Sequence, residues 1–584
     1  MPFDESSIAK IKSIALRNAI EYDGKANVNA VIARIASQIP ELRTKLKEIV
    51  SEIAKIVEDV NRVSLYDQKN LLKNLELSET SNDIPVKHSS LPPSTLPHLP
   101  PLINAKMGEV VTRFPPEPNG YPHIGHAKAA IIDQEYALMY EGKLILRFDD
   151  TNPLNEKIEY YSAISEGLEW LGIKPHIVKN TSDDLVLLYE YGKRLILQND
   201  AYVCTCSQTI IHDLRSKGLN CECRMDSSAA IERSKKMFNG SFDQQDAIIR
   251  FKGDMSSNNT AMRDPTLFRI IDAYHPRLGN KFRVWPTYDF ATPIEDSIDG
   301  VTHAMRTKEY ELRNPLYFSI LDKLKLRKPT MLEFSRLEFN NMPISKRKIK
   351  ALVEENIIQS WDDPRLPTLM GIRRRGFSPE AIRKFVLSLG LTLAETKPPF
   401  ETLEAFNRKI IDKNSIRLFF VNSPIEIQVT GILPSDVVLM NHPNVDLGCR
   451  KIHVADTFFI ARDDAVKLNI GDQIRLIELY NIKITEIKHE NNNLMLLIGV
   501  VAGSEIKKDI PKVQWVAKDD AIPYKIMIPR DLYIDDKYNR NSLQTAIGFA
   551  ESFVSTIRPD NRIQFIRFGF CRVDSNSTAI FTHR

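Results

Sequence analysis

Two histidines, His123 and His126, stand where the sequence predicts the start of a helix. The preceding residues 115–122 are rich in proline and cannot continue a strand, whereas residues 124–141 keep an uninterrupted helical pattern. A helix start carries free backbone N–H groups and the positive end of the helix dipole, so it attracts anions. The arrangement indicates a phosphate-handling site, although such a pair, taken alone, is more often a helix cap plus a core histidine.

A second candidate segment, Ser345-Lys346-Arg347-Lys348, follows an apolar stretch much later in the chain. Its cations could neutralise a polyphosphate. Runs of this kind are also common on solvated surfaces, so this one identifies no site by itself.

Together these segments resemble the HIGH and KMSKS signatures of class I aminoacyl-tRNA synthetases. Five other segments resemble motifs of the glutamyl and glutaminyl branch of that family: RFPPEPNG (113–120), LRFDDTNP (146–153), MRDPTL (262–267), WPTYDF (285–290) and WDDPR (361–365). The N-terminal region and the C-terminal third also resemble archaeal glutamyl-tRNA synthetases. The likeness therefore spans nearly the whole chain. The joint occurrence of the motifs favours a functional site over a helix cap with a core histidine and over a solvated charged loop.

The resemblance implies that ATP, with Mg²⁺ bridging its phosphates, activates an amino acid, which then moves to the 3′ end of a tRNA. It assigns His123, His126 and Lys346 to catalysis. It assigns a wider set to ATP binding: His123, Gly125, His126, Ser345, Lys346 and Arg347. The family word begins with Lys-Met where this chain has Pro343-Ile344, so one lysine contribution is missing here.

The same resemblance places five residues around the amino acid: Arg113, Glu117, Asp149, Tyr288 and Arg306. Asp149 aligns with the family's ammonium-binding aspartate. Arg306 stands where glutaminyl enzymes typically carry a small neutral residue, and its guanidinium suits a γ-carboxylate. An amide would leave that charge unpaired, at a cost of about 1–3 kcal/mol, so we expect L-glutamate. The bland alternative is that Arg306 pairs with Glu309 or Glu311 on a helix surface.

Three other functions compete with this interpretation. A glutaminyl-tRNA synthetase shares most of the motifs, but Arg306 and the helical N-terminus speak against it. A noncatalytic tRNA-binding paralogue would not need His123, His126 and Lys346, and a small nucleotidyltransferase would not need the β-rich second half. The expected tRNA is tRNA(Glu); the sequence leaves open whether tRNA(Gln) is charged as well.

Four of the six cysteines form two close pairs, Cys204-Thr-Cys206 and Cys221-Glu-Cys223. Four thiolates can close a tetrahedral shell, so the grouping predicts a structural zinc site, and similar cysteine groups occur in related glutamyl enzymes. The alternative is buried thiols without metal. Cys449 and Cys571 have no partners in sequence and are expected in the core.

These segments require a multidomain chain of mixed α/β and β structure. Sequence texture and the resemblance together predict an N-terminal helical domain (1–87), a proline-rich linker (88–104), a Rossmann-like catalytic domain (105–345) with an acceptor-binding insertion at about 200–280, a helical connector (346–415) and anticodon-binding β-barrels (416–584). The N-terminal helices carry no residue that suggests chemistry, and other translation proteins are their expected partners.

Composition excludes several classes of protein. A hydrophobic content of 43% is enough for several cores, and a net charge of +4 is too slight for a nonspecific nucleic-acid coat. No apolar run approaches the roughly 20 residues that span a membrane, and the first residues lack the pattern of a signal peptide. We therefore expect a cytoplasmic protein.

Overall fold

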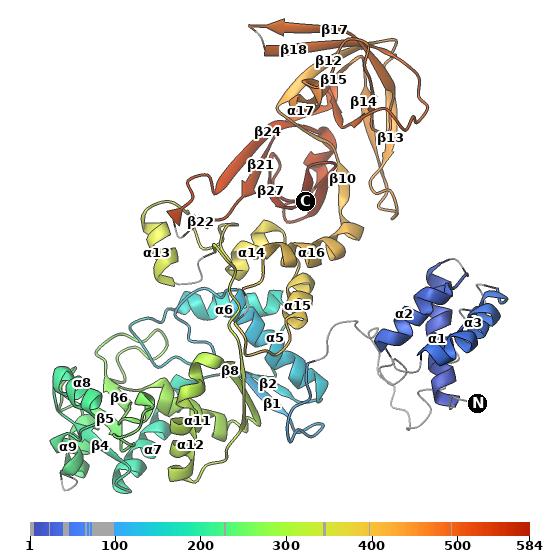
Figure 1. The fold of residues 1–584 in the computed structure, drawn as a ribbon. Helices are drawn as coiled ribbons and strands as arrows, with labels where there is room; N and C mark the ends of the chain where they lie inside the picture. The colour runs from blue at the N-terminus through green and yellow to red at the C-terminus, as the bar shows by residue number, and fades with distance from the viewer. Residues whose placement is uncertain are drawn as a thin grey trace. The chain divides into compact units, whose positions relative to one another are not determined.

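The computed structural model describes residues 5–22, 24–38, 46–64, 67–68, 71–72, 99–226, 229–342, 346–395, 397–491, 493–535 and 537–584. The chain divides into two compact units, Met1–Ser94 and Thr95–Arg584. The division falls inside the predicted proline-rich linker, of which residues 88–98 lie outside the described part. Figure 1 shows the elements of each unit.

The first unit is helical, as predicted, with helices α1 (Glu5–Glu21), α2 (Val28–Gln38) and α3 (Leu46–Asn61). Isoleucines spaced along them, such as Ile11, Ile35 and Ile53, are fully buried in a common core. Asn27 caps α2, because its side-chain oxygen accepts the backbone N–H groups of Asn29 and Ala30 at 3.0 and 3.2 Å. The predicted boundary at 39–41 lies outside the described residues.

A parallel sheet forms the centre of the second unit. Strands β1 (Val111–Phe114), β2 (Lys143–Phe148) and β3 (Ile177–Asn180) pair in that order, and β8 (His303–Thr307) pairs with β9 (Thr330–Phe334). Thr302, just before β8, exchanges hydrogen bonds with Val111, which places β8 beside β1. The strand order therefore reverses at β1, which is where open α/β sheets bind ligands.

Helices cover both faces of this sheet, so the central strands β1, β2 and β8 are buried along most of their length. Adjacent strand residues point to opposite faces. On β1, the Thr112 hydroxyl donates to the backbone of Asp133 in α5 (Ile124–Met139), whereas Arg113 binds Asp296 in α11 (Tyr288–Ile298). The remaining helices of this region are α6 (Ile158–Trp170), α7 (Leu185–Leu197) and α12 (Asn314–Leu324). The predicted doubly wound architecture is confirmed.

The predicted insertion is an antiparallel four-stranded sheet, which interrupts the parallel pattern. Its strands are β4 (Ala201–Cys204), β5 (Ile248–Phe251), β6 (Thr266–Ile270) and β7 (Val284–Pro286), with helices α8 (Gln208–Lys217), α9 (Glu222–Met225) and α10 (Ala230–Phe238).

Four helices connect the catalytic part to the C-terminal sheets: α13 (Lys346–Glu354), α14 (Leu369–Arg375), α15 (Pro379–Ser388) and α16 (Phe400–Ile411). Residues 361–367 form turns before Thr368 caps α14. Two of the three consecutive arginines at 373–375 form ion pairs: Arg374 pairs with Asp362 and Asp574, and Arg375 pairs with Glu404.

The C-terminal third consists of two seven-stranded sheets and short hairpins. One sheet has the order β10-β25-β26-β27-β21-β24-β11, and its edge strands β10 and β11 are separated in sequence only by Phe419. The other has the order β19-β16-β17-β18-β12-β15-β20, and Gln514 alone separates its edges β19 and β20. Because its two edges are consecutive in the chain, each sheet curls into a nearly closed barrel, as the β-rich texture predicts.

The strands of this third run as follows: β10 (Ile416–Leu418), β11 (Phe420–Asn422), β12 (Pro424–Thr430), β13 (Ser435–Met440), β14 (Cys449–Val454), β15 (Thr457–Ala461), β16 (Gln473–Leu476), β17 (Asn481–Glu490), β18 (Asn493–Val501), β19 (Lys512–Val513), β20 (Trp515–Ala517), β21 (Ala521–Pro529), β22 (Tyr533–Ile534), β23 (Lys537–Tyr538), β24 (Leu543–Glu551), β25 (Arg562–Phe565), β26 (Gly569–Ser575) and β27 (Thr578–His583), with helix α17 (Arg462–Ala465). Cys571 is buried as expected, but the expectation of a core position for Cys449 is wrong, since alternate residues of β14 face solvent.

A loop of the barrel that contains β21 and β24 reaches back to helix α13. Leu532, between β21 and β22, is fully buried against Ile349 and Leu352 of α13. Beside it, the backbone N–H of Tyr533 donates to the carbonyl of Asn341 at 3.3 Å. The barrel therefore supports the helix that carries Lys346.

Candidate active site

The predicted site residues gather at the carboxyl ends of the parallel strands. Glu117 and His123 follow β1, Asp149 follows β2, and Arg306 lies near the end of β8. The sheet order makes these ends neighbours, although the residues are far apart in sequence. This is the crevice that the strand reversal at β1 creates.

His123 and His126 form a reciprocal cap at the start of α5. The Nδ1 atom of His123 accepts the N–H of Gly125 at 3.1 Å, and Nδ1 of His126 accepts the N–H of His123 at 3.2 Å. The ring centroids are 4.0 Å apart. A side chain on Gly125 would start 2.9 Å from Cε1 of His123, so glycine is needed for this packing. Both histidines therefore cap α5, and their catalytic role stays a prediction.

Both imidazoles are neutral near pH 7. Burial, together with His126 and Arg336, holds the pKa of His123 well below its usual range, and burial lowers the pKa of His126 to about 4. Because each Nδ1 accepts a backbone N–H, the ring proton of each neutral histidine resides on Nε2. Each ring therefore offers one Nε2–H donor and no positive charge, which suits stabilisation of a phosphate oxygen by hydrogen bonding.

A cavity of about 260 Å³ is lined by three of the five residues that were predicted to bind the amino acid. Glu117, Asp149 and Tyr288 line it, together with residues that the sequence did not single out: Pro115, Thr151, Asn152, Thr181, Arg269, Ala291, Thr292 and Tyr310. The Tyr288 and Tyr310 rings are 5.0 Å apart. Burial raises the pKa of Tyr288 to about 12, so its hydroxyl stays protonated at neutral pH.

Hydrogen bonds fix the Asp149 carboxylate at the cavity wall. Thr181 donates to it at 2.9 Å and Arg147 at 3.3 Å, and Thr292 approaches its other oxygen at 3.5 Å. Burial raises the pKa of Asp149, and Arg147 and Thr181 oppose that rise. A cationic group in the cavity would meet a carboxylate that is already oriented.

Arg306 lies behind the tyrosines and is 6% exposed. Its guanidinium carbon is 6.0 Å from the centroid of the Tyr310 ring and 5.4 Å from that of Tyr317. Its Nε and Nη2 atoms are buried without a hydrogen-bond partner among the described residues. The alternative of a surface pair with Glu309 or Glu311 is wrong, because Arg306 belongs to the buried strand β8 and Glu309 pairs with Arg336.

Arg113 does not line the cavity. Its guanidinium is fully buried, donates to both oxygens of Asp296 at 3.1 and 3.2 Å, and donates to the carbonyl of Met305 at 2.7 Å. The expectation that Arg113 faces the substrate is therefore corrected: its side chain points to α11, and any effect on the amino acid acts through Asp296.

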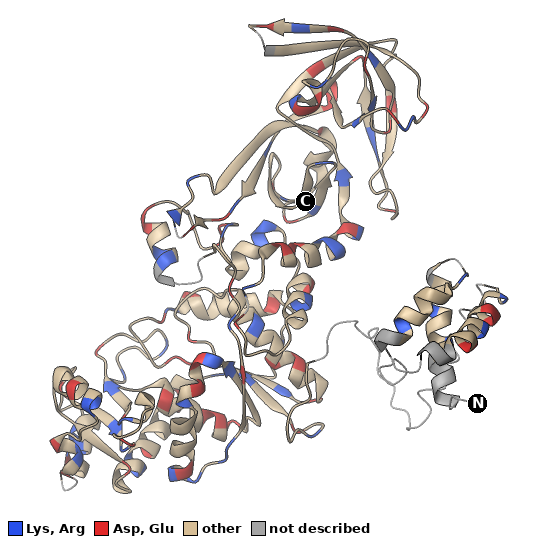
Figure 2. Cartoon of the chain, in the orientation of Figure 1, with Lys and Arg blue, Asp and Glu red and all other residues tan. Residues whose placement is uncertain are grey.

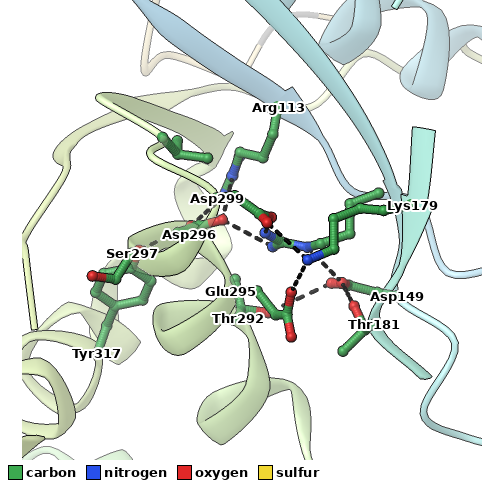
Figure 3. A network of polar contacts seen from close by, with 12 residues as sticks. Arg113, Asp149, Lys179, Thr181, Thr292, Glu295, Asp296, Ser297, Asp299 and Tyr317 are labelled. Atoms are coloured by element: carbon green, nitrogen blue, oxygen red, sulfur yellow. Dashed lines mark hydrogen bonds and ion pairs between the residues drawn. The ribbon is translucent and has the colours of Figure 1, made fainter. Parts of the chain in front are cut away.

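A buried network of charges, which the sequence did not reveal, surrounds these residues (Figure 3). Arg147 binds Asp296 at 2.8 Å and Asp299 at 2.9 Å, and Lys179 binds Glu295 at 2.8 Å and Asp299 at 2.7 Å. Figure 2 shows acidic and basic residues interspersed over the whole second unit, so this cluster has no distinctive signature in the charge pattern.

The second motif is only partly described. Ser345 lies outside the described residues, and so do the side chains of Lys346 and Arg347, although the backbone of Lys346 begins α13. Their roles stay predictions. Lys128 of α5 binds the strand that leads toward them, because its buried ammonium donates to the carbonyl of Ser335, after β9, at 2.6 Å.

The four paired cysteines meet in the insertion. The Sγ atoms of Cys204 and Cys221 are 3.9 Å apart, and those of Cys206 and Cys223 are 3.7 Å apart. Sulfur atoms of Cys204, Cys206 and Cys221 all lie within 4.8 Å of one another. Three of the four sulfurs therefore form one compact group, and Cys223 adjoins it through Cys206.

Among the helices that the structure describes, none combines the length and apolarity needed to cross a membrane.

The chain matches three family models: tRNA synthetases class I (E and Q), catalytic domain, over residues 109–413, and two anti-codon binding domains of the same family over residues 415–500 and 512–574.

The chain is also similar over its full length to curated proteins. It is 48% identical to the glutamate–tRNA ligase of Cenarchaeum symbiosum (98% of each chain), 47% identical to that of Nitrosopumilus maritimus (100% of each) and 36% identical to that of Pyrococcus abyssi (98% of each). Family models, relatives and site geometry agree, and the chain belongs to the class I glutamyl and glutaminyl tRNA synthetases.

Proposed function

We propose that this chain is a glutamate–tRNA ligase, which activates L-glutamate with ATP and transfers the glutamyl group to the 3′ end of tRNA(Glu). The buried guanidinium of Arg306, whose Nε and Nη2 atoms find no hydrogen-bond partner among the described residues, carries the choice of amino acid, because a positive charge beside the cavity fits the γ-carboxylate of glutamate. Asp149 and Glu117 take the ammonium group, and Tyr288 lines the pocket. A glutaminyl enzyme is the second candidate, and Arg306 disfavours it.

In the activation step the glutamate α-carboxylate attacks the α-phosphorus of ATP and pyrophosphate leaves. The Nε2–H groups of His123 and His126 donate to phosphate oxygens, and Gly125 lets the two rings pack at the helix start. Lys346, with Ser345 and Arg347, stabilises the leaving pyrophosphate. Mg²⁺, when bound, enters with ATP and neutralises its phosphate charge. Most of the catalysis is positioning and charge stabilisation rather than covalent chemistry.

We also infer that the cysteine cluster binds structural zinc. A tetrahedral zinc ion with Zn–S bonds of about 2.3 Å holds its sulfurs about 3.8 Å apart. The Cys204–Cys221 and Cys206–Cys223 distances, 3.9 and 3.7 Å, are close to that value, and Cys223 would move closer to Cys204 and Cys221 on binding the metal. The N–H of Thr205 reaches Cys223 at 3.5 Å, and Arg250 reaches Cys221 at 3.8 Å, which suits thiolates. Zinc would hold residues 204–223 of the insertion together, and the insertion would bind the acceptor end of the tRNA.

Contacts with other translation proteins through α1–α3 and a cytoplasmic location complete the proposal, and the experiment decides whether tRNA(Gln) is charged as well. Aminoacylation with radiolabelled glutamate and glutamine, each on purified tRNA(Glu) and tRNA(Gln), tests it. We expect glutamate on tRNA(Glu). Glutamate on tRNA(Gln) would show relaxed tRNA choice, glutamine on either tRNA would favour the glutaminyl candidate, and no product with either amino acid would support a noncatalytic paralogue.

A further inference from the structure

We propose that Asp296 is a positioning residue that sets the distance between the two ends of the amino-acid pocket. The inference rests on the proposed function, in which Asp149 binds the ammonium group and Arg306 the γ-carboxylate of glutamate. Asp296 is fully buried in α11 and does not line the cavity, so it cannot touch the substrate. Its carboxylate nevertheless binds side chains that lead to both ends (Figure 3).

One arm of the carboxylate leads to Asp149. Arg147 donates through Nη2 to Asp296 at 2.8 Å and through Nε to Asp149 at 3.3 Å, so one planar guanidinium joins the two carboxylates. The Arg147 side chain is fully buried and rigidly held, because Asp299 binds its third nitrogen at 2.9 Å. A shift of Asp296 would therefore move Asp149 with it.

The other arm leads to Arg306 by two routes. Tyr317 donates its hydroxyl to Asp296 at 2.9 Å, and its ring lies 5.4 Å from the Arg306 guanidinium carbon. Arg113 binds both oxygens of Asp296 and also the carbonyl of Met305, the residue before Arg306. One route supports the side chain and the other supports its strand.

This support matters because none of the acidic residues that the structure describes forms an ion pair with Arg306. Its Nε and Nη2 atoms lack partners in the described part of the chain, so packing and the β8 backbone must hold it in place. Asp296, in contrast, accepts from Arg113, Arg147 and Tyr317. Burial alone would raise the pKa of Asp296, but the two arginines outweigh burial and lower it, so the carboxylate is a stable anion between the two ends.

The spacing between the ends discriminates among amino acids of different length. Glutamate has two methylene groups between its α-carbon and γ-carboxylate; aspartate has one and 2-aminoadipate has three. A pocket whose ends are fixed rejects the shorter and the longer homologue by misplacing one charge. If Asp296 fixes the ends, loosening it should reduce this discrimination as well as the affinity for glutamate.

The test compares Tyr317→Phe and Asp296→Asn with the full-length wild-type chain in glutamylation of tRNA(Glu). Tyr136→Phe is the matched control, because its buried hydroxyl also donates one hydrogen bond, at 3.0 Å to the carbonyl of Pro100, away from the pocket. We expect Tyr317→Phe to raise the KM for glutamate about tenfold while the KM for ATP stays within about twofold. The inhibition constants of aspartate and of 2-aminoadipate should move closer to the KM for glutamate.

Asp296→Asn should give a larger effect of the same kind, and Tyr317→Phe keeps the test decisive if the asparagine variant does not fold. An unchanged KM for glutamate in folded Tyr317→Phe, or equal increases in the KM values for glutamate and ATP, would overturn the inference. Arg306→Cys and Asp149→Asn are measured in parallel. They distinguish a failure of the proposed pocket from a failure of the positioning role of Asp296. If these variants also leave the KM for glutamate unchanged, the proposed pocket itself is wrong.

Discussion

The backbone N–H of His123 donates to Nδ1 of His126, and this bond determines what the HIGH motif of this chain can offer ATP. With the Nδ1 atoms of both rings occupied by backbone N–H groups, the free Nε2–H groups are the only donors that the neutral imidazoles can turn toward a phosphate. The motif therefore acts through hydrogen bonds rather than through positive charge.

Titration of the two histidines tests that conclusion. The pKa of His126 falls from the ordinary 6.5 to about 4, and that of His123 is lowered as well. Because the unfolded chain binds more protons than the folded one in this range, their contribution to stability is present above about pH 6.5 and is lost as the pH falls toward 4. Long-range ¹H–¹⁵N spectra should show both rings as neutral Nε2–H tautomers from pH 8 to 5. A transition of either ring near pH 6.5 would contradict the account.

Gly125→Ala should disturb ATP use without affecting the rest of the fold. The new methyl group would lie 2.9 Å from Cε1 and 3.0 Å from Nδ1 of His123, so the ring must move and its bond to the N–H of residue 125 must weaken. We expect kcat/KM for ATP to fall about tenfold to a hundredfold, since small misplacements of a positioned donor are costly. Steady-state kinetics with varied ATP measures the change, and wild-type kinetics in a folded variant would refute the packing requirement.

Removal of zinc should destabilise the insertion selectively. Cys223→Ser deletes one sulfur of the cluster, and the measurement is zinc content by plasma mass spectrometry together with hydrogen exchange of residues 201–251. We expect about one zinc ion per chain in the wild type, loss of the metal in the variant and faster exchange in the insertion. Cys571→Ser is the control, because that buried thiol lies outside the cluster. A metal-free wild-type protein with a protected insertion would contradict the zinc proposal.

Leu532→Ala should loosen α13, against which Leu532 packs. Truncating this fully buried side chain costs about 2–5 kcal/mol, and part of that loss falls on its contacts with Ile349 and Leu352. Hydrogen exchange of residues 346–354 should increase, and the KM for ATP should rise because α13 carries Lys346. Leu543→Ala, at a position that is 39% exposed, is the control in the same barrel. Unchanged exchange in α13 would mean that the loop does not support that helix.

Much of the site could be predicted because the motifs coincide with strong local signals. Proline, glycine and helical periodicity around His123 identify the strand, loop and helix, and Asp149 follows a clear apolar strand. The structural positions of Asp296, Lys179 and Thr181 could not be predicted, since their roles arise only when β2, β3 and α11 meet. The same limit explains Arg113: its strand was predicted, but the face to which its side chain points depends on which helix covers the sheet.

The central claim is that the buried guanidinium of Arg306 selects glutamate. The most direct measurement is the ratio of kcat/KM for glutamate to that for glutamine, in charging of tRNA(Glu), for the wild type and Arg306→Cys. We predict a strong preference for glutamate in the wild type and a fall of at least about tenfold in the ratio for the variant, mainly through the KM for glutamate. An equal ratio in a folded and active variant, or a wild-type preference for glutamine, would contradict the assignment.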